Sequence, residues 1–80
     1  MRIDKFLKVS RVIKRRTVAA EACSGGRIEI NGKPAKPARE VKPGDTVTVS
    51  FGSNSLTFEV LNVDGKQTKQ SASEMYRVIE

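Results

Sequence analysis

The first sixteen residues of this chain carry the side chains whose types and spacing suggest chemistry. Seven of them are basic and only Asp4 is acidic, whereas residues 17–80 hold eight basic and eight acidic side chains. The whole net charge of +6 therefore lies in the first fifth of the sequence. Positive charge concentrated at one end of a chain is typical of a surface that binds a polyanion, above all a nucleic acid.

The run Lys14-Arg15-Arg16 stands directly before a predicted helix. A helix N-terminus carries about half a positive charge and favours acidic neighbours, so a basic triplet breaks a local rule there. Unpaired N–H groups at that end also favour phosphate, and arginine adds a planar fork that matches phosphate oxygens. The sequence therefore predicts a phosphate near residue 16.

The bland alternative is a solvated loop whose charges serve solubility. A salt-bridged surface helix would show compensating acids at helical spacing, and these are nearly absent from residues 1–16. Few aromatic side chains are present, and most fall in strand-like positions, so base stacking is a weak expectation. This composition fits recognition of the shape and phosphates of a structured RNA better than recognition of its base sequence.

Several other function classes lack their residues. The chain has no histidine and one cysteine, Cys23, so it can form neither an intrachain disulfide nor a Cys/His zinc site. The glutamates are scattered and form no paired-carboxylate site. We therefore predict a protein that is not an enzyme, with no catalytic residue, no metal and no cofactor. Without a long apolar run or a signal-peptide pattern, we expect no membrane association and a cytoplasmic location.

Two short helices are predicted to position the cations. Residues 3–9 place Ile3, Phe6 and Leu7 in one stripe, with lysines on the opposite face. A second helix is expected at 17–24, because Gly25 and Gly26 then end it. Thr17 is its expected N-cap. The expected buried stripe of this second helix consists of Val18, Ala19, Ala22 and Cys23.

A small, mostly antiparallel sheet is predicted to follow. Asn31-Gly32 within residues 27–35 is a strong signal for a tight hairpin. Alternation over 46–51 places Val47, Val49 and Phe51 on one face, and alternation over 56–63 turns Leu56, Phe58 and Val60 inward. Residues 52–55 are expected to turn, residues 64–73 to form a loop and residues 74–80 to form a last strand. We expect one α+β domain over 1–80 and a monomer.

The residues of the N-terminal half form a known pattern. Arg-x-Asp-Lys-x-Leu at 2–7, the basic run into Thr17, Gly26-Arg27-Ile28 and the turn Asn31-Gly32-Lys33 together resemble the S-four RNA-binding domain. The match covers about residues 1–51. It implies an S-four-type (alpha-L) fold, with two helices packed on a small bent sheet, which agrees with the pattern derived from the residues.

Among stand-alone domains of this kind, the chain resembles the RqcP family of ribosome-associated quality control, which is related to heat-shock protein fifteen. The resemblance implies binding to rRNA and peptidyl-tRNA on a stalled large (50S) ribosomal subunit. It also implies support of C-terminal alanine tailing by the RqcH tailing factor on the same subunit. The alternatives are a general rRNA/tRNA-binding factor or RNA chaperone, and the RNA-binding fragment of an RNA-modifying enzyme such as a pseudouridine synthase.

The resemblance also assigns roles to single residues. Arg2 and Arg16 are the strongest expectations, since they flank the two predicted helix starts. Asp4 has two open interpretations, an acid that stabilises the helix dipole or a partner that orients Arg2 or Arg16. Lys33 and Lys36 are expected to be solvated charges rather than rim contacts. The predicted RNA-binding residues are Arg2, Lys5, Lys8, Arg11, Lys14, Arg15, Arg16 and Arg27.

Overall fold

The chain begins with two short helices and continues as a sheet. In the computed structural model, residues 1–63 and 75–79 are described, with the side chain of Phe51 excepted. Helix α1 spans Ile3–Val9 and helix α2 spans Arg16–Ser24. The strands are β1 (Ile28–Ile30), β2 (Lys33–Pro34), β3 (Thr46–Phe51), β4 (Asn54–Val60) and β5 (Tyr76–Val78).

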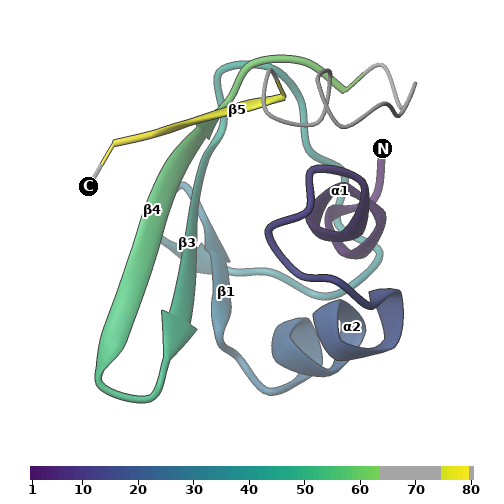
Figure 1. Ribbon diagram of the computed structural model, residues 1–80, viewed down its shortest axis with the longest axis vertical. Helices are drawn as coiled ribbons and strands as arrows, with labels where there is room; N and C mark the ends of the chain where they lie inside the picture. Colours follow the sequence, from purple (N-terminus) through teal and green to yellow (C-terminus); the bar gives the residue numbers. More distant parts are fainter. Residues whose placement is uncertain (64–74, 80) are drawn as a thin grey trace.

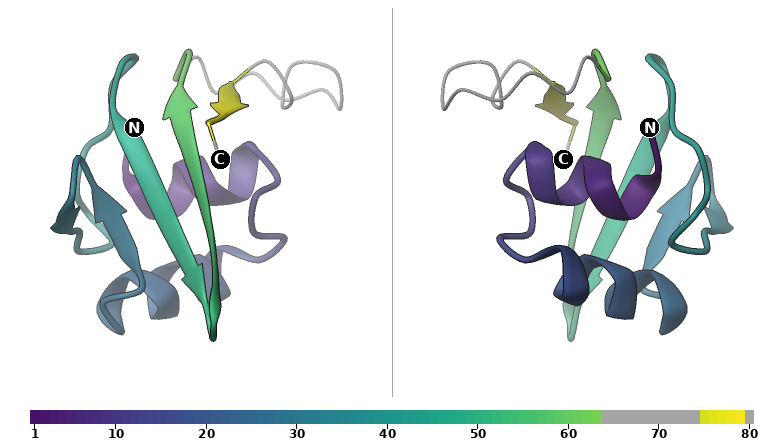
Figure 2. Two further views of the ribbon diagram at one scale, coloured as in Figure 1. Left: turned by 90° about the vertical axis from the view of Figure 1, so that its left-hand side faces the viewer. Right: turned by 90° about the vertical axis from the view of Figure 1, so that its right-hand side faces the viewer.

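The five strands form one sheet in the order β2-β1-β3-β4-β5, and every neighbouring pair is antiparallel. Figures 1 and 2 show two layers, with both helices packed against one face of this sheet. The S-four-type α+β fold expected from the sequence is therefore confirmed.

The core lies between the helices and the sheet. Ile3, Phe6 and Leu7 of α1 are fully buried, as predicted for its apolar stripe. The rings of Phe6 and Phe58 are stacked at a centroid separation of 6.1 Å, which joins α1 to β4. Phe58 also meets Tyr76 of β5 edge-on at 5.0 Å. This packing holds the helix pair in a fixed position over the strands.

The helices follow the sequence prediction with two corrections in α2. Its first residue is Arg16 and its N-cap is Arg15, which makes no side-chain capping bond. Thr17 is therefore inside the helix, and its predicted role as the N-cap is wrong. Val18 is 46% exposed, so the prediction that it belongs to the buried stripe is also wrong. The stripe consists of Ala19, Ala22 and Cys23, whose mean direction at 100° per residue is about 90° away from that of position 18.

The predicted hairpin at 27–35 is confirmed. Asn31 and Gly32 have φ angles of 54° and 83°, which is the pair of positive values that a tight two-residue turn requires. Pro34 lies in β2 at the edge of the sheet, where a residue without an N–H group is tolerated.

The later strands agree with the prediction except at their ends. Strand β3 has the predicted bounds, and Val47 and Val49 are buried as expected. Strand β4 starts earlier than predicted, since Phe51 pairs with Asn54 across a turn of only two residues, and it ends at Val60. Among the described residues of the last strand predicted at 74–80, β5 spans Tyr76–Val78. The loop predicted at 64–73 and the inward side chain predicted for Phe51 lie outside the described residues.

Candidate RNA-binding surface

A buried carboxylate organises two of the predicted RNA-binding arginines. Asp4, in the first turn of α1, is only 3% exposed. Its Oδ2 accepts a hydrogen bond from a guanidinium nitrogen of Arg2 at 3.1 Å, and its Oδ1 lies 3.7 Å from Arg16. A buried carboxylate needs such partners. Asp4 therefore pairs with both arginines, which agrees with its interpretation as an orienting partner, and it also stands in the first helical turn, as the other interpretation requires.

The two arginines keep half of their surface for another ligand. Their side chains are 48% and 50% exposed, although both are paired with Asp4. Arg2 is further fixed through its backbone, which forms a bridge with Glu40. The amino group of Met1 is bound to the Glu40 carboxylate at 2.7 Å. Arg2 is thus held through its backbone and through its side chain, about half of which remains exposed to solvent.

The starts of the two helices differ in what their N–H groups contact. At α1, the N–H of Ile3 donates to the Arg39 carbonyl, and the N–H of Asp4 donates to the Pro37 carbonyl. The N–H of Lys5 donates to Asp4 Oδ1 at 2.7 Å. The start of α1 therefore offers no free N–H group in this first turn, and the expectation that phosphate binds at both helix starts is not supported for α1.

At α2 no side chain of the described residues caps the first turn, and that turn holds no acid. Arg16, Thr17 and Val18 are exposed there. N–H groups in the first turn of a helix have no partner within the helix. The start of α2 is therefore a place where an anion gains both the helix dipole and the guanidinium of Arg16.

The segment between the helices has an unusual backbone. Helix α1 ends at Val9, and Arg11 adopts a left-handed conformation with φ of 65°. The N–H of Arg11 donates to the Lys8 carbonyl at 3.1 Å, and the N–H of Ile13 donates to the Leu7 carbonyl at 3.0 Å. This arrangement resembles the helix C-terminal motif in which glycine normally takes the left-handed position. The chain therefore reverses sharply before α2.

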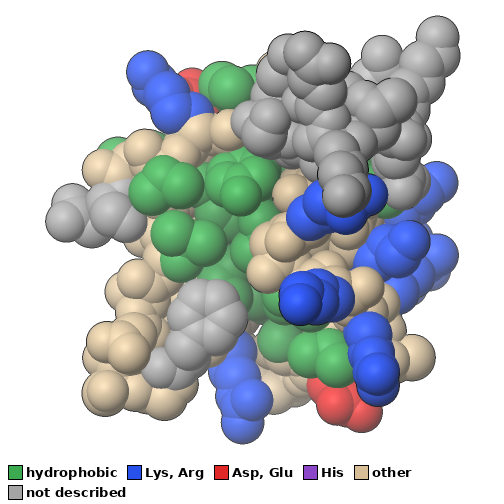
Figure 3. Space-filling view, viewed as in Figure 1, with side chains coloured by type: hydrophobic (Ala, Val, Ile, Leu, Met, Phe, Trp, Pro, Cys, Tyr) green, Lys and Arg blue, Asp and Glu red, His purple; other side chains and the backbone are tan. Residues whose placement is uncertain are grey.

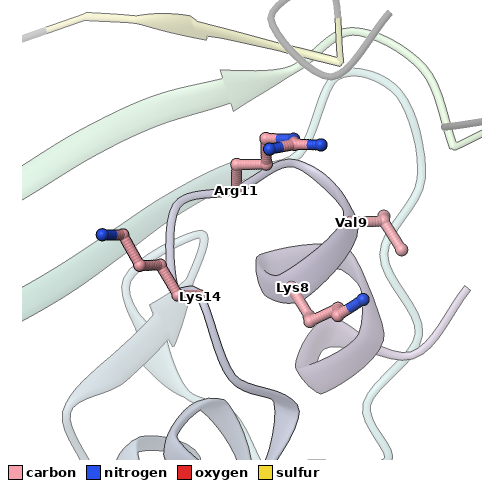
Figure 4. Close-up of a pocket in the computed structure, with 4 residues that line it drawn as sticks. All are labelled: Lys8, Val9, Arg11 and Lys14. Carbon is pink, nitrogen blue, oxygen red and sulfur yellow. The ribbon is translucent and has the colours of Figure 1, made fainter. Parts of the chain in front are cut away.

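A hollow of ≈ 340 Å³ lies beside this reversal, and its described lining is Lys8, Val9, Arg11 and Lys14. Figure 4 shows Lys8 and Val9 on α1, with Arg11 and Lys14 on the segment that follows. The three cationic side chains stand around the hollow and point in different directions (Figure 4). Within the described part of the chain, no carboxylate forms an ion pair with any of these three cations.

The remaining predicted RNA-binding cations, Lys5, Arg15 and Arg27, belong neither to the group around Asp4 nor to the hollow beside Arg11. Lys5 and Arg15 are exposed on α1 and at the start of α2. Figure 3 shows Lys and Arg side chains gathered over the helical side of the molecule, beside an apolar area over the strands. Arg27 differs from the others, because its side chain lies by Gly25, beyond the C-terminal end of α2. Arg16 is the first of the nine residues of α2, so that end lies about 12 Å from it along the helix.

Three other residues are placed as the sequence predicts. Lys33 and Lys36 are exposed, in agreement with solvated charges. Cys23 is 4% exposed within the core. Burial, and to a lesser degree the charge of Asp4, raises the pKa of its thiol to about 11. A thiol that resists ionisation is a poor nucleophile and a poor redox sensor, so Cys23 is a core residue.

Sequence reasoning did not find the hollow beside Arg11. The segment from Ser10 to Lys14 contains no glycine, so its composition gives no sign of a left-handed turn. Among the described residues, no cluster of acidic or cysteine side chains could hold a metal ion. None of the helices found in residues 1–63 and 75–79 is long and apolar enough to cross a membrane.

Comparison with known proteins identifies the family of the chain. The S4 domain matches residues 1–47. The chain is 50% identical over 80 residues to the RQC P-site tRNA stabilizing factor of Bacillus subtilis, covering all of this chain and 93% of that protein. It is 51% identical over 78 residues to the protein of the same name from Halalkalibacterium halodurans, covering 98% of this chain and 89% of that protein.

Among solved structures, the trimeric heat shock protein 15 of Vibrio cholerae has the same fold. It superposes with a TM-score of 0.88 at 29% identity, over 98% of this chain and 80% of that one. The monomeric state that we expect here stays a prediction beside this trimeric neighbour. On the matched domain, the extent of identity and the shared fold, this chain belongs to the S4 domain family, in the group of RQC P-site tRNA stabilizing factors.

Proposed function

We propose that this protein is a non-catalytic RNA-binding factor of ribosome-associated quality control. It binds rRNA and peptidyl-tRNA on stalled large ribosomal subunits in the cytoplasm and thereby supports alanine tailing of nascent chains by RqcH. The observation that carries the proposal is the uncapped start of α2, with Arg16 beside it and Arg2 joined to Arg16 through Asp4. The names of the relatives, P-site tRNA stabilizing factors, support tRNA as one of the two RNA partners.

The physical basis is the recognition of phosphate rather than of bases. Phosphate at the start of α2 gains the unpaired N–H groups and the Arg16 fork, and it relieves the repulsion among Lys14, Arg15 and Arg16. The aromatic rings of Phe6 and Phe58 are buried, so these two cannot stack on bases. Contacts of this kind position a protein on a folded RNA without reading its sequence.

The test is co-sedimentation of the protein with large ribosomal subunits at two salt concentrations. Arg16→Ala should remove most of the association and leave the fold intact, because the Arg16 side chain is half exposed. Arg77→Ala is the matched control, since it removes an equal charge from a residue of β5 that is paired with Glu59. If about five phosphates are neutralised, the slope of log affinity against log salt should be about −3.5 to −4.5.

Comparison of subunits with and without peptidyl-tRNA separates this function from general RNA binding. The proposed factor should bind the tRNA-carrying subunits more tightly, whereas a general RNA chaperone would bind both alike. Equal pelleting of Arg16→Ala and Arg77→Ala would count against the proposal.

A further inference from the structure

We propose that the hollow lined by Lys8, Arg11 and Lys14 is a second phosphate site, which holds one phosphodiester group of an RNA strand. This inference rests on the proposed function, since it adds a separate subsite to the same RNA-binding surface. The hollow lies at the C-terminal end of α1, whereas the Arg2–Asp4–Arg16 group lies at its N-terminal end. The two ends are about 10 Å apart along the seven-residue helix.

Three cationic side chains line one concave surface. On a continuous helix, residues 8, 11 and 14 would form a stripe about 9 Å long. The reversal at Arg11 instead places all three around one hollow of ≈ 340 Å³. Their charged ends point apart (Figure 4), and like charges repel one another. Exposed side chains change rotamer within nanoseconds, so the three cations can close on a phosphate.

Arg11 also occupies a position where arginine is unfavourable. A left-handed conformation is strained for a non-glycine residue, and glycine is the usual choice at this point of a helix end. Locally unfavourable residues are concentrated at functional sites. The guanidinium therefore has a use that offsets the backbone strain.

The ordinary structural explanation for these cations does not account for them. Cations near a helix C-terminus often bond the last carbonyl groups. Here the Leu7 carbonyl already accepts from the N–H of Ile13 and from Ser10 Oγ, and the Lys8 carbonyl accepts from the N–H of Arg11. The side chains of Lys8, Arg11 and Lys14 are thus not needed to complete α1.

The decisive experiment measures the salt dependence of binding to bulk tRNA. If the three cations share one phosphate, the triple variant Lys8→Ala/Arg11→Gly/Lys14→Ala should flatten the log–log salt slope by about 0.7–0.9 in total. The single variants should then show losses that are less than additive. Three independent contacts would flatten the slope by about two to three units with additive losses, and this result would overturn the proposal.

Two further measurements keep the test independent of folding and of the ribosome. Arg11→Gly should melt at a temperature at least as high as the wild type while binding tRNA more weakly; a lower melting temperature would overturn the argument from strain. Titration of labelled protein with inorganic phosphate, against chloride at equal ionic strength, should shift the amide signals of residues 8–14 and leave those of Lys33 unchanged. Uniform or absent shifts would overturn the site.

These outcomes are separate from those of the proposed function. A wild-type protein that shows the phosphate shifts and the shared slope, but does not pellet with large subunits, would retain the second site and lose the ribosomal role. A protein that pellets normally, with additive losses at the three positions, would retain the ribosomal role and lose the second site.

Discussion

Arg16, the first residue of α2, lies 3.7 Å from Oδ1 of Asp4, the second residue of α1. The first turn of α2 contains no acid of its own. The neighbouring helix therefore supplies the carboxylate that a helix start favours. The same carboxylate, that of Asp4, is also the ion-pair partner of the Arg16 guanidinium. The basic triplet before α2 is tolerated because tertiary packing brings Asp4 to it, and because half of Arg16 remains exposed to solvent.

Asp4→Asn tests this relationship. Asparagine can still accept the bond from the Lys5 N–H, but it carries no charge for Arg2 and Arg16. Since both arginines are half exposed, solvent screens the lost attraction, and the free energy of unfolding should fall by only about 1 kcal/mol. Urea unfolding measures this change. Affinity for large subunits should nevertheless decrease, because the two guanidinium groups are no longer held in place.

The control for Asp4→Asn is Glu21→Gln, which makes the same charge change on the exposed side of α2. Each variant loses one negative charge, which should slightly strengthen the non-specific binding of RNA in both. If Asp4→Asn bound subunits as tightly as Glu21→Gln, the orienting role of Asp4 would be wrong.

Because the Cys23 thiol is buried, we expect the free energy of unfolding to decrease at high pH. An unfolded cysteine ionises at about pH 8.5, whereas the folded Cys23 keeps its proton up to about pH 11. Between these values the folded state binds more protons than the unfolded state, so stability falls as the pH rises. Below about pH 8 both states are protonated, and the thiol contributes no pH dependence.

Cys23→Ala provides the comparison, because the two proteins differ only in this side chain. The wild type should lose roughly 2 kcal/mol more than Cys23→Ala between pH 8 and 10.5. Unfolding in urea at several pH values gives the difference. Parallel curves for the two proteins would show that the thiol ionises normally in the folded state.

Two substitutions of Asn31 in the hairpin turn should lower stability by different amounts. Asn31 has a positive φ of 54°, donates to Asp45 at 3.1 Å and accepts from the N–H of Thr46 at 2.9 Å. Asn31→Ala loses both bonds and strains the backbone, so we expect a loss of about 2–3 kcal/mol. Asn31→Gly loses the same bonds without the strain and should cost about 1 kcal/mol less. Thermal or urea unfolding of the two variants measures the difference, and equal losses would contradict the strain argument.

The sequence by itself determined the elements whose signals are local. The apolar stripe of α1, the Asn31-Gly32 turn and the alternation of β3 each depend on residues within a few positions of one another, and each was predicted with correct bounds or nearly so. The concentration of cations in residues 1–16 is equally a property of the chain. Local signals can also mislead. Thr17 is a residue type that often caps a helix, and it was predicted as the N-cap, but the helix already begins at Arg16.

Only the tertiary structure decided how the cations are grouped. The sequence left the role of Asp4 open between a dipole partner and an orienting carboxylate, because the packing of α1 on α2 is needed to bring Arg16 within 3.7 Å. It also gave no hollow beside Arg11, since the left-handed turn there comes from bonds that span up to six residues and from the docking of both helices on the sheet. Composition fixes the net charge of +6, but packing fixes where the cationic side chains lie relative to one another and to Asp4.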